Sequence, residues 1–476
     1  MMNKKDFRKH AHELVDWMAD YMEQKESYPV TPQVSPGEIY QQLPNDAPEV
    51  PDSFETIFKD FEEIIMPGMS HWQHPAFFGY FPANNSEPSI LAEMLMATLG
   101  AQCMSWLTSP AATELEEKVV EWLRDAKGLD SNWKGVIQDT ASTGTLCAIL
   151  AAREKASSFA INQRGFSGKE KYRVYSSLHV HSSVDKAMRI AGLGKENLVK
   201  INVDKSFAMD PEALELAIKA DLQQGYKPIC VISALGTTSS TAIDPIDKIG
   251  DICIQYNMWH HIDAAYAGTA LLLPEYRWMS KGHEKADSYV FNPHKWMFTN
   301  FDCSVLYVKD AQHLVHTFSM TPEYLKTSHD QDVNNYRDWG IQLGRRFRAL
   351  KLWFVLRSYG LEGIRKKLRV HLSLTQSVVN LVENESNLEL FSPIPLNTIC
   401  FRFVDKSFGF EKLNEINQRW MESVNATGKA FFTHTKLDEK YCIRWVIGQT
   451  DVNQSHIDKT WTLLMEMLKN IIKPSN

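Results

Sequence analysis

The spacing of hydrophobic residues predicts two amphipathic helices near the N-terminus, at residues 4–24 and 54–65. Residues 28–51, between them, are rich in proline and are expected to form an extended connector. Residues 1–85 would then have too little hydrophobic core to fold alone. We therefore expect a helical N-terminal arm over residues 1–85 that packs on the main body or on another subunit.

Apolar runs and amphipathic segments alternate through the middle of the chain. This alternation predicts an α/β fold, in which a mostly parallel sheet is sandwiched by helices. Ligands of such sheets bind beyond the carboxyl ends of the strands, so functional residues are expected there. The expected strands are 135–137, 173–176, 198–203, 229–235, 259–263, 289–291 and 304–308, and the expected helices are 90–104, 113–127, 146–157, 182–191, 211–223 and 246–256.

The last third of the chain changes character. Residues 309–340 are polar and are predicted to be irregular, and a helix at 345–359 should end before Gly360. A further helix, strands at 398–403, 430–433 and 441–446 and a terminal helix from residue 454 predict a small α+β domain. We therefore divide the chain into the N-terminal arm at 1–85, a large α/β domain at 86–350 and a small C-terminal α+β domain at 351–476.

The overall composition narrows the class of protein. The 476 residues are 44% hydrophobic and 23% charged with a net charge of -7, which argues against a nucleic-acid or anionic-membrane surface. The 7 cysteines are widely spread, none with CxxC spacing, and several lie in apolar runs, which is typical of a reducing cytoplasm. Charges throughout residues 1–26 argue against a signal sequence, and no apolar run reaches the roughly 20 residues that span a bilayer.

One lysine lies at the end of a predicted buried strand. Pro293 ends the strand after Phe291, and Lys295 follows among large apolar side chains. Such surroundings lower the pKa of an amine and make it usable for Schiff-base chemistry. The alternative is an ordinary surface lysine in a turn.

Four other strand ends carry polar residues. Residues 140–145 place small hydroxyl residues and a glycine before a helix, which suits a phosphate, although a plain helix cap is the alternative. Asp263 ends another strand and needs a cationic partner, such as a protonated ring nitrogen, unless it caps a helix. His179 and His181 could bind a metal, but no third ligand is spaced with them. The imidazole of His181 can also stack on a flat ring. Thr238 adds a hydroxyl at a further strand end.

Together these groups predict a site for pyridoxal 5'-phosphate, with no metal. A helix start would hold the phosphate, Asp263 the ring nitrogen and Lys295 the aldehyde. Residues 71–82 are dense in aromatic side chains, which predicts either a hydrophobic plug or the wall of a pocket for an aromatic ligand.

The sequence resembles the pyridoxal-phosphate-dependent group II decarboxylases, and within them the aromatic L-amino-acid decarboxylases. The likeness extends from about residue 7 to about residue 461. It rests on the motifs at 74–82, 105–116, 181–184, 261–268, 292–296 and 343–348. The resemblance implies the fold type I of pyridoxal-phosphate enzymes and a homodimer whose active sites are shared between subunits. From the charge and composition we expect no nucleic-acid or membrane partner.

The same resemblance implies a role for individual residues. Lys295 would form the Schiff base, Asp263 would pair with the ring nitrogen, and His181 would stack on the ring. Tyr324, in the long loop, would return a proton to the alpha carbon after carbon dioxide leaves. The remaining cofactor-binding residues would be Ala141, Ser142, Thr238, Ala265, Asn292 and His294, of which Ala141, Ser142, Asn292 and His294 would hold the phosphate.

The implied reaction is decarboxylation of an aromatic L-amino acid (Trp, Tyr, Phe or L-DOPA) to the arylalkylamine. Trp72, Tyr80 and Phe81 would line the substrate pocket, and Gly344 would leave room for the aromatic ring. Ala83, Gln102 and Met104 replace the threonine, isoleucine and phenylalanine of the animal enzymes, which leaves the choice of substrate open. Thr143-Gly144 replaces the more usual Glu-Ala after the phosphate-site serine.

Three other readings remain open at this point. The first is oxidative decarboxylation to an aldehyde, although Tyr324 stands where the aldehyde synthases typically have phenylalanine. The second is a non-aromatic substrate. The third is a protein that binds the cofactor without turnover, or a scaffold.

Overall fold

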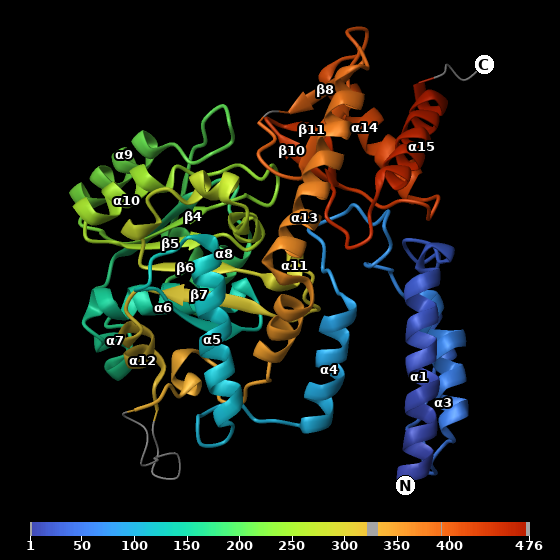
Figure 1. The fold of residues 1–476 in the computed structure, drawn as a ribbon. Coiled ribbons are helices and arrows are strands. Elements are labelled where there is room, and N and C mark those ends of the chain that lie inside the picture. The colour runs from blue at the N-terminus through green and yellow to red at the C-terminus, as the bar shows by residue number, and fades with distance from the viewer. Residues whose placement is uncertain (1, 321–331, 392, 473–476) are drawn as a thin grey trace. The chain divides into compact units, whose positions relative to one another are not determined.

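The computed structural model describes residues 2–320, 332–391 and 393–472 (Figure 1). Its chain forms two compact units. The sheet unit comprises Ala83–Gln376 and Phe391–Ile399. The terminal unit comprises Met1–Pro82, Ser377–Leu390 and Cys400–Asn476.

A seven-stranded sheet forms the centre of the sheet unit, with the strand order β1-β7-β6-β5-β4-β2-β3. β7 runs antiparallel to both of its neighbours, and the other neighbouring strands run parallel. The predicted mostly parallel sheet is therefore confirmed. Its strands are β1 (Lys134–Gln138), β2 (Tyr172–Ser177), β3 (Leu198–Ile201), β4 (Lys227–Ala234), β5 (Trp259–Asp263), β6 (Ser288–Phe291) and β7 (Ser304–Val308).

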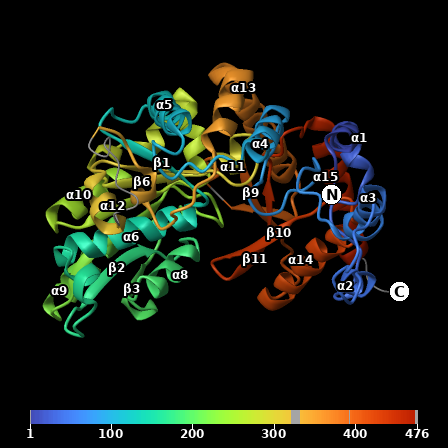
Figure 2. The ribbon, with the colours of Figure 1, turned by 90° about the horizontal axis from the view of Figure 1, so that it is seen from below.

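Helices cover both faces of this sheet (Figures 1 and 2). On one face, α6 (Ala141–Ser157), α8 (Ser183–Ile190) and α12 (Gln312–Phe318) enclose a core that includes Val290 and Leu306. On the other, α9 (Pro211–Gln223) and α10 (Ile246–Gln255) enclose a core that includes Val231. The unit also contains α4 (Glu87–Leu99), α5 (Pro110–Lys127), α7 (Ala160–Arg164), α11 (Pro293–Trp296) and the 3₁₀ helices η4 (Lys195–Asn197), η5 (Ala267–Leu272), η6 (Pro274–Ser280), η7 (His283–Lys285) and η9 (Tyr336–Trp339).

Helix α6 begins three residues after the end of β1, because Thr140 caps its start and Gly144 lets it pack closely on the sheet. The Thr140 hydroxyl accepts a hydrogen bond from the Thr143 N–H at 3.4 Å. A Cβ on Gly144 would lie 2.9 Å from Val290 Cγ2, so only glycine lets the helix sit this close to β6. The helix predicted from residue 146 therefore begins at Ala141, which puts the candidate phosphate residues in its first turn.

Several other predicted bounds are corrected by the structure. The helix expected at 90–104 is α4, which ends at Leu99 because Gly100 adopts a left-handed conformation with φ 58°. The helix expected at 345–359 lies in α13 (Ala349–Glu383), whose helical geometry is interrupted at Gly360 with φ 63° and ψ 167°. The segment expected to be irregular, 309–340, contains α12 and η9, since a few apolar side chains such as Leu314 and Trp339 are buried against the core.

The arm of the terminal unit is a helical hairpin with little core. Of the 21 residues of α1 (Lys4–Gln24), only His10 is buried. Its rings pack on the second helix, with His10 stacked on Phe54 at 4.2 Å between ring centres. The predicted second helix is α3 (Phe54–Asp60), continued by the π-helical turn η2 (Phe61–Ile65). The connector at 28–51 is not wholly extended, since it contains the short helix α2 (Glu38–Gln42). The 3₁₀ helices η1 (Lys25–Ser27) and η3 (Met66–Gly68) lie before the connector and after η2.

A second sheet has four strands in the order β10-β11-β9-β8. Its strands are β8 (Leu388–Phe391), β9 (Thr398–Phe403), β10 (Thr433–Leu437) and β11 (Lys440–Val446), and its helices are α14 (Phe410–Asn425) and α15 (Gln454–Ile472). β8 was not predicted, and the strand expected at 430–433 begins only at Thr433. Both strands lack the fully buried apolar run that marks β9.

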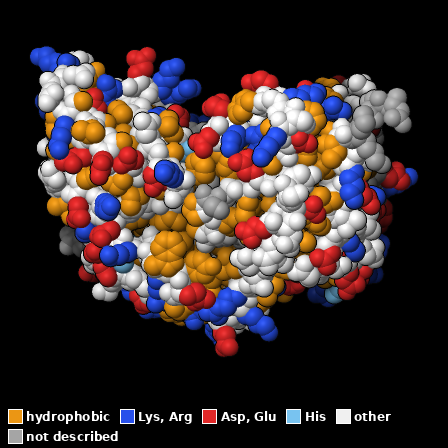
Figure 3. Space-filling view, turned by 90° about the horizontal axis from the view of Figure 1, so that it is seen from above, with side chains coloured by type: hydrophobic (Ala, Val, Ile, Leu, Met, Phe, Trp, Pro, Cys, Tyr) orange, Lys and Arg blue, Asp and Glu red, His pale blue; other side chains and the backbone are white. Residues whose placement is uncertain are grey.

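The surface carries charges of both signs. Figure 3 shows acidic and basic side chains interspersed over one face, with hydrophobic side chains between them. Among the residues that the structure describes, no helix is both long enough and apolar enough to cross a membrane.

Candidate active site

The predicted site residues follow strands whose carboxyl ends share one edge of the sheet. β7 is antiparallel to both β1 and β6, so β1 points in the same direction as the parallel strands. The register places Asp263 opposite Ala234 on β4 and Val290 on β6. The start of α6, His181, Thr238, Asp263 and Asn292 therefore emerge along the same edge.

Asp263 and Lys295 come from neighbouring strands at this edge. Asp263 is buried at the end of β5, and its Oδ1 accepts a hydrogen bond from the Ala265 N–H at 3.0 Å. Lys295 is half-buried on the short helix α11, between the buried residues His294 and Trp296. The Asn292 N–H donates to the Ala265 carbonyl at 3.0 Å, which ties the turn after β5 to the end of β6.

His181 lies within electrostatic reach of both groups. Neighbouring protein atoms and the Lys295 cation lower the pKa of His181, while the Asp263 carboxylate opposes them. The Ser183 N–H donates to Nδ1 at 3.2 Å, so the proton of the neutral ring is on Nε2. Desolvation is the largest of these effects, followed by the charge of Lys295 and then by that of Asp263. An amine and a carboxylate therefore lie close enough to the neutral ring to act on it electrostatically.

The first turn of α6 offers N–H groups to an anion. Ala141 and Ser142 lie there, where backbone N–H groups have no partner inside the helix and the helix dipole favours negative charge. His294 adds a donor. Its Nδ1 accepts a hydrogen bond from the Cys303 N–H at 2.8 Å, and burial lowers the pKa of His294 to about 3. The ring is therefore neutral near pH 7 and carries its proton on Nε2.

Asn292 completes this set. Its amide oxygen is buried and has no hydrogen-bond partner among the described residues. A buried amide without a partner is costly unless a ligand satisfies it. Because the amide can rotate, it can present its NH2 group to the same space. The residues present therefore fit a phosphate-bearing cofactor that also carries an aldehyde and a ring nitrogen.

Thr238 and Ala265 are the last two predicted cofactor residues. Thr238 is exposed in the turn after β4, two residues after Gly236, whose φ of 82° needs glycine. Ala265 is half-buried directly after the Asp263 turn. Both therefore lie at the same sheet edge as Asp263.

The predicted substrate residues of the sheet unit form two groups. Ala83 is half-buried beside Asn84, whose N–H approaches the Lys295 carbonyl at 3.5 Å. Gln102 and Gly344 are neighbours, since a Cβ on Gly344 would lie 3.3 Å from Gln102 Nε2, and both line a cavity of about 340 Å³. The carbonyl of Met104, close by in the chain, accepts a hydrogen bond from the Arg337 N–H at 2.9 Å.

The aromatic substrate residues of the terminal unit cluster together. Trp72 and Tyr80 stack with 5.6 Å between ring centres. The Arg444 guanidinium lies 4.6 Å from the centre of the Phe81 ring and donates to the Tyr80 carbonyl at 2.9 Å. Tyr324 lies outside the described residues.

A buried polar chain supports the site and was missed from the sequence. His261 Nε2 contacts the Thr145 hydroxyl of α6 at 3.2 Å, and its Nδ1 contacts the Ser288 hydroxyl of β6 at 2.8 Å. Burial lowers the pKa of His261 to about 3, so this link is neutral. The available signal was strand alternation, since residues 261 and 263 lie on the same face of β5. Among the described residues, no group of three or more metal-ligating side chains occurs.

Comparison with known proteins decides the family. A model described as the pyridoxal-dependent decarboxylase conserved domain matches residues 36–404. The chain belongs to the pyridoxal-dependent decarboxylase family. Its cofactor is pyridoxal 5'-phosphate.

Members of this family resemble the chain over nearly its whole length. Tryptophan decarboxylase 2 of Oryza sativa subsp. japonica is 40% identical over 99% of this chain and 96% of its own. Phenylacetaldehyde synthase of Arabidopsis thaliana is 41% identical over 98% of this chain and 96% of its own. The structure of Oryza sativa TDC with PLP and tryptamine matches with a TM-score of 0.95 at 32% identity, covering 99% of each chain. The predicted fold type I is thereby confirmed.

Proposed function

We propose that the protein decarboxylates an aromatic L-amino acid, releasing carbon dioxide and the arylalkylamine. The observation that carries this proposal is the placement of Lys295 and Asp263, which both act on the His181 imidazole. Relatives named tryptophan decarboxylase and tyrosine decarboxylase, at 40% identity, support an aromatic substrate.

Each residue at the sheet edge has a role in this proposal. When bound, pyridoxal phosphate supplies an aldehyde for amine attachment and a ring that withdraws electrons from the alpha carbon. Lys295 Nζ would hold the aldehyde carbon between turnovers, and the Asp263 carboxylate would retain a proton on the ring nitrogen. The exposed face of His181 would stack on the ring and fix its plane.

The remaining roles concern the phosphate and the final proton. The first turn of α6, the Nε2–H of His294 and the amide of Asn292 would bind the phosphate. Tyr324 would donate the proton that replaces the lost carboxylate at the alpha carbon. A tyrosine there, placed by the loop, would give general acid catalysis worth on the order of 10²–10⁴-fold.

The substrate is tested by direct assay. The holoenzyme is incubated with Trp, Tyr, Phe and L-DOPA, with glutamate as a non-aromatic control, and carbon dioxide and amine are measured. We expect equal amounts of amine and carbon dioxide from at least one aromatic substrate. Release from glutamate alone would refute the aromatic assignment, and Lys295→Ala should lose both activity and the absorbance band of lysine-bound cofactor.

A second candidate is oxidative decarboxylation to an aromatic aldehyde, favoured by the 41% identity to a phenylacetaldehyde synthase. That reaction consumes dioxygen and water, and releases aldehyde, carbon dioxide, ammonia and hydrogen peroxide. Tyr324 argues against it, since a placed acid would protonate the alpha carbon before oxygen reacts. Peroxide equal to carbon dioxide would establish this reaction in the wild type. Tyr324→Phe should raise the peroxide fraction.

We also propose a homodimer with shared active sites. Helix α1 has only one buried residue, and four apolar residues of α4 are exposed at 37–63%. These residues are Leu91, Met94, Leu95 and Leu99. Exposed apolar surface of this kind marks an interface. Sedimentation should give twice the chain mass, and a fully active monomer would contradict the proposal.

We further propose that the chain divides into three parts at residues 85 and 350 and that the protein is located in the cytoplasm. All 7 cysteines are free and buried, as expected in a reducing compartment. Fractionation of the native source with an activity assay tests the location. Limited proteolysis tests the boundary at residue 85, which lies between helices, because cleavage should concentrate there.

A further inference from the structure

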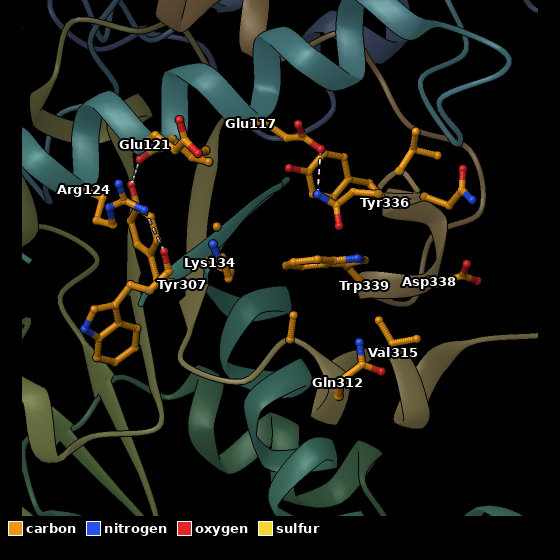
Figure 4. A pocket seen from close by; sticks show the side chains of 17 residues that line it. Glu117, Glu121, Arg124, Lys134, Tyr307, Gln312, Val315, Tyr336, Asp338 and Trp339 are labelled. Carbon is orange, nitrogen blue, oxygen red and sulfur yellow. Dashed lines mark hydrogen bonds between the residues drawn. The ribbon is translucent and has the colours of Figure 1, made fainter. Parts of the chain in front are cut away.

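A second cavity of the sheet unit lies beside the edge strand β1, away from the residues of the candidate active site. It has a volume of about 420 Å³, which lies in the range of small-molecule sites. Its walls come from α5, from β1 and from the segment that contains α12 and η9 (Figure 4). None of its lining residues belongs to the predicted cofactor or substrate set.

The walls combine aromatic rings with carboxylates. Trp133, Tyr307, Tyr336 and Trp339 line the cavity and are almost fully buried. In Figure 4, the side chains of Glu117 and Glu121 extend from α5. Tyr336 and Trp339 lie at one end of the cavity, and Arg124 and Tyr307 lie at the other. The Arg124 guanidinium is already engaged, because it pairs with Asp125 at 2.8 Å and donates to the Ser131 carbonyl at 3.0 Å.

Glu117 is the carboxylate that lacks a counter-charge, whereas Glu121 Oε2 pairs with Lys118 Nζ at 2.8 Å. Lys134 also lines the cavity. Glu117 accepts a hydrogen bond from Asn334 Nδ2 at 2.6 Å, and none of the described cationic side chains pairs with it. Burial raises the pKa of Glu117, and the carboxylates of Glu114 and Glu121 add to the effect. A cation in the cavity would offset this repulsion.

We infer that this cavity is a binding site for an aromatic monoamine cation, with its ammonium group at Glu117 and its ring against Tyr336 and Trp339. Aromatic walls favour both a flat ring and an adjacent cation. An aromatic amino acid fits less well, because its carboxylate would lie beside Glu117. The chemistry therefore selects the amine over the amino acid. That the amine is also the product of the enzyme rests on the proposed function.

The η9 segment connects this cavity to the predicted substrate residues. Its Arg337 N–H donates to the Met104 carbonyl at 2.9 Å. The Arg345 guanidinium lies 4.9 Å from the centre of the Tyr336 ring, and the Arg345 N–H donates to Gln102 Oε1 at 2.7 Å. A ligand that displaces Tyr336 therefore changes the support of Gln102 and Met104. We expect bound amine to slow turnover from outside the active site.

Binding is tested by calorimetric titration with tryptamine. Holoenzyme is first treated with borohydride, which reduces the bond between Lys295 and the cofactor and prevents the amine from joining the cofactor. We expect one site per chain, weakened at least about tenfold by Glu117→Gln, which keeps an acceptor for Asn334. Glu212→Gln, an exposed site on α9, makes the same change in net charge and should bind as the wild type does.

Two results would overturn the inference. One is the absence of binding, and the other is equal affinity in the wild type and the Glu117→Gln variant, which places the amine elsewhere. Indole-3-propionate, of similar shape but opposite charge, should bind at least about tenfold more weakly, and equal binding also counts against the site. The titration requires no turnover, so it stands even if the protein decarboxylates no aromatic amino acid.

Inhibition kinetics test the connection to the active site. With the holoenzyme, amine should lower kcat as well as raise KM in the wild type. In Glu117→Gln, the effect on kcat should disappear while the effect on KM remains. Purely competitive inhibition in both proteins would show that occupancy of the cavity does not reach the active site.

Discussion

The amine of Lys127 lies 3.2 Å from the centre of the Phe291 ring. Lys127 is completely buried, and its Nζ has no hydrogen-bond partner among the described residues. The rings of Tyr289 and Tyr307 lie 4.6 and 5.0 Å from the same nitrogen. Burial lowers the pKa of Lys127. Attraction to an aromatic face is worth up to about 2 kcal/mol, less than the several kcal/mol that burying an ion costs.

Replacing this lysine by methionine should stabilise the fold. Lys127→Met keeps the length of the side chain and removes a buried polar group without a partner, which costs about 1–3 kcal/mol. We expect the free energy of unfolding in urea near pH 7 to rise by a similar amount. Lys248→Met, at an exposed position on α10, provides a control that should change the free energy of unfolding by less than about 0.5 kcal/mol. A less stable Lys127→Met protein would contradict the argument.

The extra stability of Lys127→Met over the wild type should decrease as pH rises. The pKa of lysine is lowered in the folded protein and is about 10.4 when unfolded, so the unfolded chain binds more protons between these values. Wild-type stability should therefore rise relative to Lys127→Met as pH increases toward about 10.4. Denaturation series at pH 7, 8.5 and 10 should show that the difference in free energy of unfolding between Lys127→Met and the wild type becomes smaller. A constant difference would indicate a charged Lys127.

Asp263→Asn should separate charge from geometry at the sheet edge. The amide still accepts the Ala265 N–H but cannot hold a proton on a ring nitrogen by charge. We expect kcat to fall by on the order of 10²–10⁴-fold with the cofactor still bound. Asp251→Asn on α10 serves as the control and should leave kcat unchanged.

The same variant has a readout that does not depend on activity. Asp263 raises the pKa of His181 and Lys295 lowers it. NMR titration of the apoenzyme should therefore show a lower His181 pKa in Asp263→Asn and a higher one in Lys295→Met. Unchanged values in both would place the three groups too far apart to share one ring.

His294 should contribute to cofactor affinity through a neutral N–H. His294→Phe, which lacks the donor, should raise the dissociation constant for pyridoxal phosphate about tenfold. His294→Gln, which keeps an N–H donor, should raise this dissociation constant less. Because burial lowers the pKa of His294 to about 3, this difference should be constant between pH 5 and 8. Fluorescence titration measures it. A difference that grows as pH falls to 5 would indicate a charged ring.

A buried ion pair behind the cavity should be costly to break. Arg345 Nη2 lies 2.7 Å from Glu116 Oε1, and the two side chains are only 5% and 3% exposed. Arg345→Met leaves the carboxylate buried without its partner, which should cost about 3–5 kcal/mol in chemical denaturation. Arg369→Met breaks an exposed pair with Glu275 and should cost less than about 1 kcal/mol. Similar costs for the two variants would show that burial is not the cause.

The elements with clear sequence patterns were predicted well. Strands 259–263 and 304–308 and the helix at 211–223 have their expected bounds. Their signals are local: apolar runs ended by polar residues, and Asp210 and Pro211 at a helix start. A mostly parallel sheet, with functional residues at the carboxyl ends of its strands, also followed from the alternation of strands and helices. The positions of Lys295, Asp263 and His181 after separate strands were therefore predictable, whereas their roles remain a proposal.

Features that depend on distant residues were not predictable in this way. α12 and η9 are held by burial against a core formed by other segments, and each is too short to show a clear hydrophobic period. The antiparallel direction of β7 leaves no mark on its apolar residues. The contact of His261 with Thr145 joins positions that only the folded sheet brings together. The cavity beside β1 likewise requires α5 and η9 to meet.

The position of β7 has a consequence for the order in which the molecule is made. β7 separates β1 from β6, so the α6 start and Lys295, 154 positions apart in the sequence, share an edge only after β7 has inserted between their strands. Residues 304–308 must therefore leave the ribosome before the complete site for pyridoxal phosphate can form. Non-local strand pairing of this kind is slow. Cofactor uptake during synthesis should therefore be a late event that marks a completed sheet.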